Sequence, residues 1–388
     1  MGSMKILYLS RGFNVGGLEK NVLLLSRELR KDSHQVVMGA SRGSLTETIE
    51  KEGVRFVDFN FSFINVVKMA KDVVRLERLV SEECPDIIHV FSATPGVVLW
   101  LAKLLYVART AFKKKFPPIV SSIMGLQTSP DEWYTATQLR NYCVCFAAQR
   151  VYIISPAIGK FVHRLPLKKS RLQELNVVGI KLPSPATTDT LALKKELAIP
   201  PGDRVVMTIG RLEACKSHEL FIQTACKVLF RNPDVTFIIV GVGPLKAGLQ
   251  SIVDKNNVSS KVKLVGLRTD VYELLSMCDV YMKPGVVNGF IGITVLEAQA
   301  MGVPVVAWYT EDVTMAIENG ITGFLINGTD TNAMAEKIGT LLADKKQAEK
   351  IGENGRTFVQ KTFTIEGIAR NLLKAYEQEI SGDKIYSK

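Results

Sequence analysis

Short apolar runs alternate with amphipathic stretches through the first half of the chain. Strand-like runs lie at 5–10, 35–40, 54–59, 86–91, 118–124 and 151–155. Helical patterns lie between them, at 18–30, 44–52, 65–82, 95–108 and 131–148. Strands that alternate with helices in this way predict a parallel sheet with helices on both faces.

The alternation stops at a Pro/Ser/Thr-rich stretch, 182–190, which we interpret as a linker, and then restarts. Strand patterns, several of them almost entirely apolar, follow at 204–210, 235–241, 262–267, 279–284, 303–308 and 323–327. Helical patterns follow at 191–199, 217–231, 245–254, 270–277, 292–301, 312–319, 331–343, 346–361 and 365–380. We therefore predict an α/β chain with two Rossmann-like domains, 4–182 and 183–363, that face each other across a ligand-binding cleft.

Length and composition fit a soluble globular protein with two cores. The chain has 388 residues, 47% hydrophobic and 22% charged. No apolar stretch reaches the roughly 18 to 20 residues needed to cross a bilayer. Because a strand-like run follows Lys5 at once, we expect no signal peptide. The six scattered cysteines suit a reducing compartment, so a cytoplasmic protein is expected.

The positive charge is concentrated in the first domain. The formal net charge is +11, and residues 1–182 hold 26 Lys and Arg against 15 Asp and Glu, whereas the remainder is balanced. A one-sided charge of this kind fits an anionic partner, such as a membrane surface or a phosphorylated acceptor, or serves solubility alone. No recognition motif accompanies the charge, which argues against nucleic acid as the partner.

Two cations follow the first strand of the second domain. Arg211 comes after this strand, and Lys216 stands just before the next helix. Cations at the carboxyl edge of a parallel sheet, beside a helix N-terminus, suit a diphosphate, although they also fit solvated loop charges. Cys215 stands where a P-loop would have its second glycine, so we reject that motif.

Glycine-rich loops end other strands. Gly241 and Gly243 lack the third glycine of a dinucleotide fingerprint but allow a ligand to approach the backbone. Arg268 and nearby amides are available to a base. In the first domain, Gly16 and Gly17 precede a helix, where they either bring amides to the same diphosphate or form a simple turn and cap.

The loop 289–294 precedes a helix whose first amides can receive an anion. Glu297 lies one turn into this helix. A carboxylate at that place can accept hydrogen bonds from the two vicinal hydroxyls of a ribose. It also fits a partner in a salt bridge or a helix-dipole interaction.

Hydrolase and metal motifs are not convincing in this sequence. Residues 39–43 match the G-x-S-x-G elbow of hydrolases, but no acid and histidine are evident at suitable later strand ends. Neither H-E-x-x-H nor D-x-D occurs, so we expect no metal ion. If a nucleoside diphosphate leaves at this site, Arg211, Lys216 and helix amides must stabilise its charge without metal.

Taken in order, the motifs resemble those of a known family. In the second domain they are G-R-L…K at 210–216, G-x-G-P at 241–244, V-G-L at 265–267, L-E-A-x-A-x-G-x-P-V-V at 296–306 and G-x-T-G-F-L at 320–325. The first domain adds the weaker matches G-G-x-E at 16–19, D-I-I-H-V at 86–90 and N-V-V-G-I at 176–180. The chain resembles the retaining GT-B glycosyltransferases of family 4, which move a sugar from a nucleotide diphosphate.

The resemblance implies roles for the candidate residues: Arg211 and Lys216 hold the diphosphate, and Glu297 holds the ribose. The whole donor-binding set that it implies is Gly16, Gly17, Arg211, Lys216, Gly241, Gly243, Leu267, Arg268, Asn288, Gly289, Phe290, Ile291, Gly292, Ile293, Thr294 and Glu297. The final helix, 364–388, would return to the N-terminal domain. Retention in this family is attributed to front-face attack assisted by the donor phosphate, so no protein general base is assigned.

Two positions depart from the family pattern. Gly289 stands eight residues before Glu297, where the family commonly has a glutamate that touches the donor sugar; with a one-residue insertion, the counterpart is Asn288. Met124, followed by Gly125, stands where the family commonly has a histidine close to the transferred sugar. Both departures concern the sugar rather than the nucleotide.

The first domain also offers a basic and aromatic segment, 97–118, which suits an anionic lipid surface or, more simply, a core helix followed by solvated charges. Its aromatic members are Trp100, Tyr106, Phe112 and Phe116. The lysines predicted to contact the membrane are Lys113, Lys114, Lys115, Lys168 and Lys169. We therefore expect a protein that is peripheral on the inner face of the cytoplasmic membrane.

Our leading hypothesis is a retaining glycosyltransferase that moves a sugar from a nucleotide-diphosphate donor, a UDP-sugar, to a glycan or lipid-linked acceptor in surface polysaccharide or glycolipid assembly. It would need no cofactor and no metal. The alternatives are a catalytically silent GT-B subunit that binds a partner or acceptor, and a sugar-nucleotide epimerase or hydrolase on the same fold. The sequence leaves the oligomeric state open.

Overall fold

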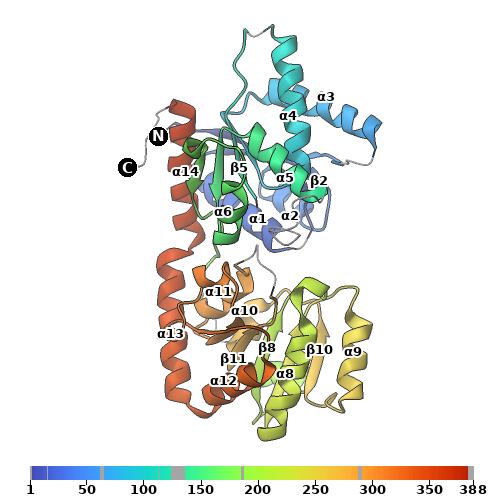
Figure 1. Ribbon diagram of the computed structural model, residues 1–388, viewed down its shortest axis with the longest axis vertical. Coiled ribbons are helices and arrows are strands. Elements are labelled where there is room, and N and C mark those ends of the chain that lie inside the picture. The colour runs from blue at the N-terminus through green and yellow to red at the C-terminus, as the bar shows by residue number, and fades with distance from the viewer. Residues whose placement is uncertain are drawn as a thin grey trace. The chain divides into compact units, whose positions relative to one another are not determined.

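The computed structural model describes residues 2–14, 16–61, 65–111, 113–123, 136–184, 188–286 and 291–382. Contacts within the chain divide it into two units (Figure 1). Unit 1 runs to Gly179 and includes the segment that begins at Ile365, and unit 2 spans Ile180–Thr364.

Unit 1 contains, within its described residues, a seven-stranded parallel sheet in the order β3-β2-β1-β4-β5-β6-β7. Its strands are β1 (Lys5–Gly12), β2 (Gln35–Ser41), β3 (Arg55–Asp58), β4 (Ile87–Val90), β5 (Ile119–Ser122), β6 (Arg150–Ile153) and β7 (Leu172–Glu174). Its helices are α1 (Gly17–Lys31), α2 (Thr46–Lys51), α3 (Val66–Glu83), α4 (Ala93–Arg109), α5 (Ala136–Ala147), α6 (Pro156–His163), the 3-10 turn η1 (Lys169–Arg171) and α14 (Ile365–Ser381). The sequence did not predict β7, which is short and only partly buried.

Helix α14 belongs to the core of unit 1, where it contacts α1. Its Tyr376 hydroxyl lies 2.5 Å from Nδ1 of His89, and Nε2 of His89 lies 2.8 Å from Oγ of Ser122. Burial lowers the pKa of His89 to about 3, so its ring is neutral: one nitrogen donates to one of these hydroxyls, and the other accepts from the second. A buried polar chain therefore fastens the last helix to strands β4 and β5.

Unit 2 contains, over its described ranges, a six-stranded parallel sheet in the order β10-β9-β8-β11-β12-β13. Its strands are β8 (Arg204–Ile209), β9 (Val235–Val240), β10 (Val262–Gly266), β11 (Val280–Lys283), β12 (Val305–Trp308) and β13 (Phe324–Ile326). Its helices are α7 (Thr190–Glu196), η2 (Ala214–Lys216), α8 (His218–Arg231), α9 (Lys246–Lys255), α10 (Val271–Ser276), α11 (Ile293–Ala300), η3 (Val313–Met315), α12 (Thr331–Ala343) and α13 (Lys345–Thr362). The predicted fold class, α/β with two Rossmann-like domains, is confirmed.

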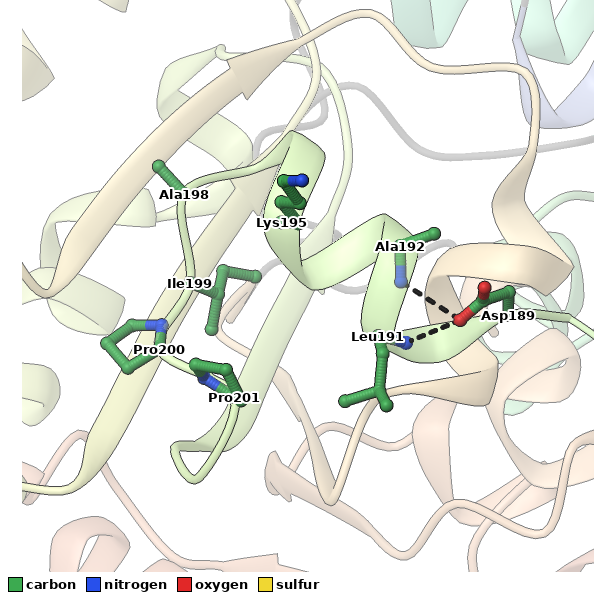
Figure 2. Close-up of a pocket in the computed structure, with 8 residues that line it drawn as sticks. All are labelled: Asp189, Leu191, Ala192, Lys195, Ala198, Ile199, Pro200 and Pro201. Atoms are coloured by element: carbon green, nitrogen blue, oxygen red, sulfur yellow. Dashed lines mark hydrogen bonds between the residues drawn. The ribbon is translucent and has the colours of Figure 1, made fainter.

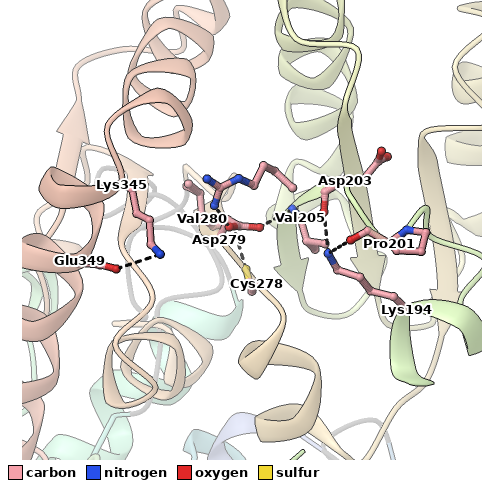
Figure 3. Close-up of polar contacts among 10 residues, drawn as sticks. Lys194, Pro201, Asp203, Val205, Cys278, Asp279, Val280, Lys345 and Glu349 are labelled. Carbon is pink, nitrogen blue, oxygen red and sulfur yellow. Dashed lines mark hydrogen bonds and ion pairs between the residues drawn. The ribbon is translucent and has the colours of Figure 1, made fainter. Parts of the chain in front are cut away.

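Polar contacts at the amino-terminal edge of this sheet fix β11 beside β8 (Figure 3). Asp279 accepts a hydrogen bond of 2.8 Å from the amide of Val205. It also forms an ion pair with Arg204, whose guanidinium lies 2.6 Å from its carboxylate. Lys194 donates to the carbonyls of Pro201, at 3.1 Å, and Asp203, at 2.8 Å. The bonds of Asp279 thus join β8 and β11, the two strands between which the strand order reverses.

Two predicted helices are shorter than their sequence patterns indicated. The pattern at 312–319 forms only the 3-10 turn η3, because a turn follows in which the amide of Glu318 donates to Oγ1 of Thr322 at 2.8 Å. The pattern at 191–199 forms a helix that ends at Glu196, since Ala198 adopts φ +51°. Neither change alters the order of strands.

Candidate functional site

The candidate site lies at the carboxyl edge of the second sheet, between β8 and β11. The strand order reverses there, and open α/β sheets bind ligands at such a point. The loops after these two strands touch: a Cβ at Gly285 would lie 3.3 Å from the carbonyl oxygen of Cys215. The Arg211–Lys216 segment and the segment leading to Glu297 are therefore adjacent.

Two glycines hold the loop that carries Arg211. Gly241 adopts φ +144°, and a Cβ there would lie 1.9 Å from the carbonyl oxygen of Gly210. A Cβ at Gly243 would lie 2.5 Å from the carbonyl oxygen of Leu212, whose amide donates to Val242 at 2.9 Å. Close packing of two backbones thus requires these glycines, whereas the sequence suggested close approach by a ligand. Their contact with a donor stays a prediction.

The two predicted diphosphate ligands differ in their surroundings. Arg211 is 62% exposed and forms an ion pair of 2.9 Å with Glu213. Lys216 is partly buried, and this burial lowers the pKa of its ammonium. Its aliphatic carbons lie against Gly210. Lys216 is thus the more buried of the two cations, and Arg211 the more exposed one.

His218 supports this loop and was not singled out in the sequence. It is buried at the start of α8, and its Nε2 lies 3.1 Å from the carbonyl oxygen of Arg211. Burial lowers its pKa, so the ring is neutral and donates to that carbonyl. Its signal in the sequence was its place beside Lys216 at a helix start.

The N-terminus of α11 is fixed to the end of β8. The hydroxyl of Tyr281 donates to Oγ1 of Thr294 at 2.7 Å and accepts from the amide of Ile209 at 3.3 Å. Gly292, before the helix, adopts φ +88°, which favours glycine. The amides of Ile293 and Thr294 belong to the first turn, which has no intrahelical acceptor for them, so they can receive an anion.

Glu297 is almost completely buried, with 6% of its surface exposed. Its negative charge adds to burial in raising the pKa of two neighbours, Tyr272 and Tyr281, the latter to about 12. The carboxylate therefore lies in the same cluster as Tyr281 and the first turn of α11, beside the edge where Arg211 and Lys216 lie.

A third cation, Lys283, ends β11 at this edge, and no motif had indicated it. Its ammonium donates to the carbonyl oxygen of Gly285 at 2.8 Å. The only trace in the sequence is a single lysine after three apolar residues of a strand.

The loop after β10 presents an exposed apolar side chain, Leu267, which is 57% exposed. The neighbouring Arg268 forms ion pairs with Asp270 and Glu196, which raise the pKa of its guanidinium further. Two carboxylates therefore hold Arg268 in place, and contact of either residue with a base stays a prediction.

Several predicted positions lie outside the described residues. They are Met124, Gly125, Asn288, Gly289 and Phe290, together with Phe112 of the basic segment. Ile291, the next residue along the loop, is described and is buried. In the ranges that the structure describes, no cluster of three or more His, Cys, Asp or Glu side chains is arranged to hold a metal ion.

At the N-terminus of α1, where the sequence predicted an anion site, the structure places the carboxylate of Glu19 next to Gly16. Gly16 precedes the helix, and a Cβ there would lie 2.3 Å from Oε2 of Glu19, a first-turn residue. Gly16 thus leaves room for the Glu19 carboxylate beside the start of the helix. A diphosphate that used Gly16 and Gly17 would have to compete with this carboxylate.

The aromatic part of the proposed membrane segment needs correction. Tyr106 and Phe116 are 8% and 6% exposed, and their rings pack edge to face with centroids 5.1 Å apart, so they belong to the core. Trp100 on α4 is 42% exposed. The five predicted lysines at 113–115, 168 and 169 are all exposed.

An apolar hollow of about 600 Å³ lies elsewhere in unit 2, beside α7 and the turn that ends at Pro201 (Figure 2). Asp189 caps this helix by accepting from the amides of Leu191 and Ala192 at 3.1 and 3.0 Å. None of the predicted donor residues lines this hollow.

Comparison with known families decides the assignment. The profile of Glycosyl transferases group 1 matches residues 189–358, and that of the Glycosyl transferase 4-like domain matches residues 16–174. The chain belongs to glycosyltransferase family 4. The family resemblance drawn from the motifs is therefore confirmed.

Individual relatives of this family 4 member are distant. A lipopolysaccharide core biosynthesis mannosyltransferase of Rhizobium meliloti is 31% identical over 198 residues, 49% of this chain and 56% of that one. An N-acetyl-alpha-D-glucosaminyl L-malate synthase of Bacillus anthracis is 28% identical over 196 residues, 50% of this chain and 51% of that one. The chain thus spans about half the length of the curated relatives it matches.

Solved structures show that the GT-B fold extends over the whole chain. The Anabaena protein Alr3699/HepE in complex with UDP and glucose has a TM-score of 0.81 at 21% identity, with 97% of this chain and 100% of that chain covered. At this identity the likeness shows the fold alone. Among the described helices of the family 4 chain, none is both long and apolar enough to cross a membrane.

Proposed function

We propose that this protein is a retaining glycosyltransferase that transfers a sugar from a nucleotide-diphosphate donor to a glycan or lipid-linked acceptor. One observation carries the proposal: Arg211, Lys216 and the N-terminus of α11 gather where the strand order of the second sheet reverses. Positive groups at that edge suit a diphosphate, and the buried Glu297 suits the ribose next to it.

For the donor we propose a UDP-sugar. The Anabaena structure with the same fold is described as a complex with UDP and glucose, which supports this choice. The exposed side chain of Leu267 offers an apolar surface to a flat base, at the end of the strand next to β9. The base-contacting role of Leu267 and Arg268 is part of the proposal.

The chemical step needs little from protein acids or bases. The bond from the anomeric carbon to the diphosphate oxygen breaks, and the acceptor oxygen forms a bond to that carbon on the same face. The acceptor proton passes to the leaving diphosphate. Arg211, Lys216 and the amides of α11 would stabilise the growing negative charge, in a site that we propose works without a metal ion.

For the acceptor side, we propose contact with an anionic membrane surface through the exposed lysines at 113–115, 168 and 169. Residues 113–115 precede β5, and 168 and 169 precede β7, so both groups lie at the amino-terminal edge of the first sheet. Only β6 separates these strands, which lie about 10 Å apart across the sheet. They can therefore act as one basic surface on a peripheral cytoplasmic protein.

A donor panel tests the proposed function. The purified protein is incubated with radiolabelled UDP-, GDP- and ADP-sugars and a membrane lipid extract or glycan fraction. We expect label in the acceptor fraction with one nucleotide, and most strongly with a UDP-sugar. Release of nucleotide without labelled acceptor would favour a sugar-nucleotide hydrolase. Failure of every nucleotide to bind would favour a catalytically silent subunit.

A further inference from the structure

Lys283 lies at the carboxyl edge of the second sheet. It ends β11, whose other three residues are fully buried. Of the three N–H bonds of its ammonium, one goes to the carbonyl oxygen of Gly285 at 2.8 Å. Within the described ranges no other acceptor lies within hydrogen-bond distance of this ammonium. Among the described residues, two of its three donors therefore have no acceptor.

Three elements surround this side chain, and two of them belong to the proposed donor site. The Gly285 turn packs on the Lys216 loop, since a Cβ at Gly285 would lie 3.8 Å from Cα of Lys216. Cε and Cδ of Lys283 lie 3.6 and 3.8 Å from where Gly292 would carry a Cβ, just before α11. The third element is the loop after β12, whose buried Asp312 acts electrostatically on Lys283.

Electrostatics at this place favour an anionic ligand. Burial, together with the nearby charge of Lys216, lowers the pKa of Lys283 to about 8, and Asp312 opposes this lowering with a smaller effect. Arg211 in turn disfavours the charge on Lys216, while Cys215 and Glu213 favour it. The positive end of α11 adds to the same field. Repulsion among these cations would be relieved by a bound anion.

We propose that Lys283 is a third cation of the donor site and donates hydrogen bonds to the diphosphate of the nucleotide donor, alongside Lys216. This inference rests on the proposed function. It also extends it, because the diphosphate gains negative charge as its bond to the sugar breaks. A partly buried cation at that place would bind the departing diphosphate more strongly than the intact donor and so favour transfer.

The test is calorimetric titration of Lys283→Met, which keeps the length of the side chain and removes its charge. Wild type is first titrated with UDP, GDP and ADP, and the nucleotide that binds is then used throughout. Lys255→Met removes an exposed lysine at the end of α9 and is the matched control. The nucleoside without phosphates, measured by saturation-transfer NMR, reports the rest of the site.

We expect Lys283→Met to bind the nucleoside diphosphate about 10- to 100-fold more weakly, the effect of one charged hydrogen bond in a buried site. Binding of the nucleoside should not change, and Lys255→Met should behave as wild type. Unchanged affinity for the diphosphate in Lys283→Met would overturn the inference. An equal loss for diphosphate and nucleoside would also overturn it, because it would indicate general distortion.

The pH dependence gives a second readout. As the pH rises from 7 to 9, the ammonium of Lys283 loses its proton in the ligand-free protein, so the affinity of wild type for the diphosphate should fall. In Lys283→Met the affinity for the diphosphate should fall less steeply with pH, because only the deprotonation of Lys216 then contributes. Equal slopes would contradict the inference. If wild type itself binds no nucleoside diphosphate, the proposed function fails, and this result is distinct from a failure of Lys283.

Discussion

Glu297 lies in the second turn of a helix whose N-terminus is the positive end of the proposed donor site. Its carboxylate is enclosed by protein, and a buried charge of this kind is maintained only where polar groups can hydrogen-bond it. A pair of ribose hydroxyls would supply two such donors. Its role can therefore be tested one hydroxyl at a time.

Glu297→Ala should abolish discrimination between ribose and deoxyribose. Wild type is expected to bind a ribonucleoside diphosphate about 10- to 100-fold more tightly than its 2′-deoxy and 3′-deoxy analogues, since each lost hydroxyl removes a hydrogen bond to a carboxylate. In Glu297→Ala the three ligands should bind with nearly equal affinity by calorimetry. Glu219→Ala, an exposed first-turn glutamate of α8, is the control. Undiminished discrimination in Glu297→Ala would exclude the ribose role.

The residues that sequence reasoning found are those that belong to spaced motifs. Arg211, Lys216 and Glu297 could be located because each stands at a fixed distance from a strand end or a helix start. Lys283 could not, since a single polar residue after an apolar run belongs to no spaced motif. His218 was missed although it lies at a helix start close to Lys216, because no motif pointed to it. Glu19 was missed as the group facing Gly16 because its position depends on how the side chain folds back.

At the scale of elements, the alternation of strands and helices predicted both parallel sheets. Buried strands such as β9 are continuous apolar runs, which made them easy to find. β7 was missed because its three residues form a partly exposed edge strand with no apolar pattern. The helix expected at 312–319 has suitable periodicity, but the turn around Thr322 ends it early.

Asp279 at the opposite edge of the second sheet supports the site by holding β11 beside β8 (Figure 3). Asp279→Ala removes a charged hydrogen bond to a backbone amide and an ion pair with Arg204. We expect unit 2 to lose about 2 kcal/mol of stability, and its Tm to fall by about 4–8 °C in calorimetric scans.

The control for Asp279 is a different ion pair in the same unit. Glu349→Ala breaks the exposed pair with Lys345, at 3.6 Å, which should cost under about 0.5 kcal/mol. If Asp279→Ala unfolds at the wild-type temperature, or no lower than Glu349→Ala, the contacts at this edge do not fix the strand order.

At the scale of the whole molecule, the excess charge of the first half is consistent with a function for its basic edge. Each lysine near an anionic membrane surface contributes about 1 kcal/mol. Replacing Lys113, Lys114 and Lys115 with Ser should therefore weaken co-sedimentation with anionic liposomes by about two orders of magnitude at low salt. The same change at the exposed Lys345, Lys346 and Lys350 of unit 2 is the control. Equal binding by the two triple variants would show that this edge is not the membrane contact.

The central claim is that a nucleoside diphosphate binds where β8 and β11 end, with Lys216 as its partly buried cation. Lys216→Ala tests it most directly, by calorimetric titration with the nucleoside diphosphate that wild type binds and by transfer from the matching sugar donor. Wild type should bind and transfer. Lys216→Ala should lose transfer and bind at least about 10-fold more weakly, with an unchanged circular dichroism spectrum. Wild-type affinity and turnover in Lys216→Ala would contradict the account.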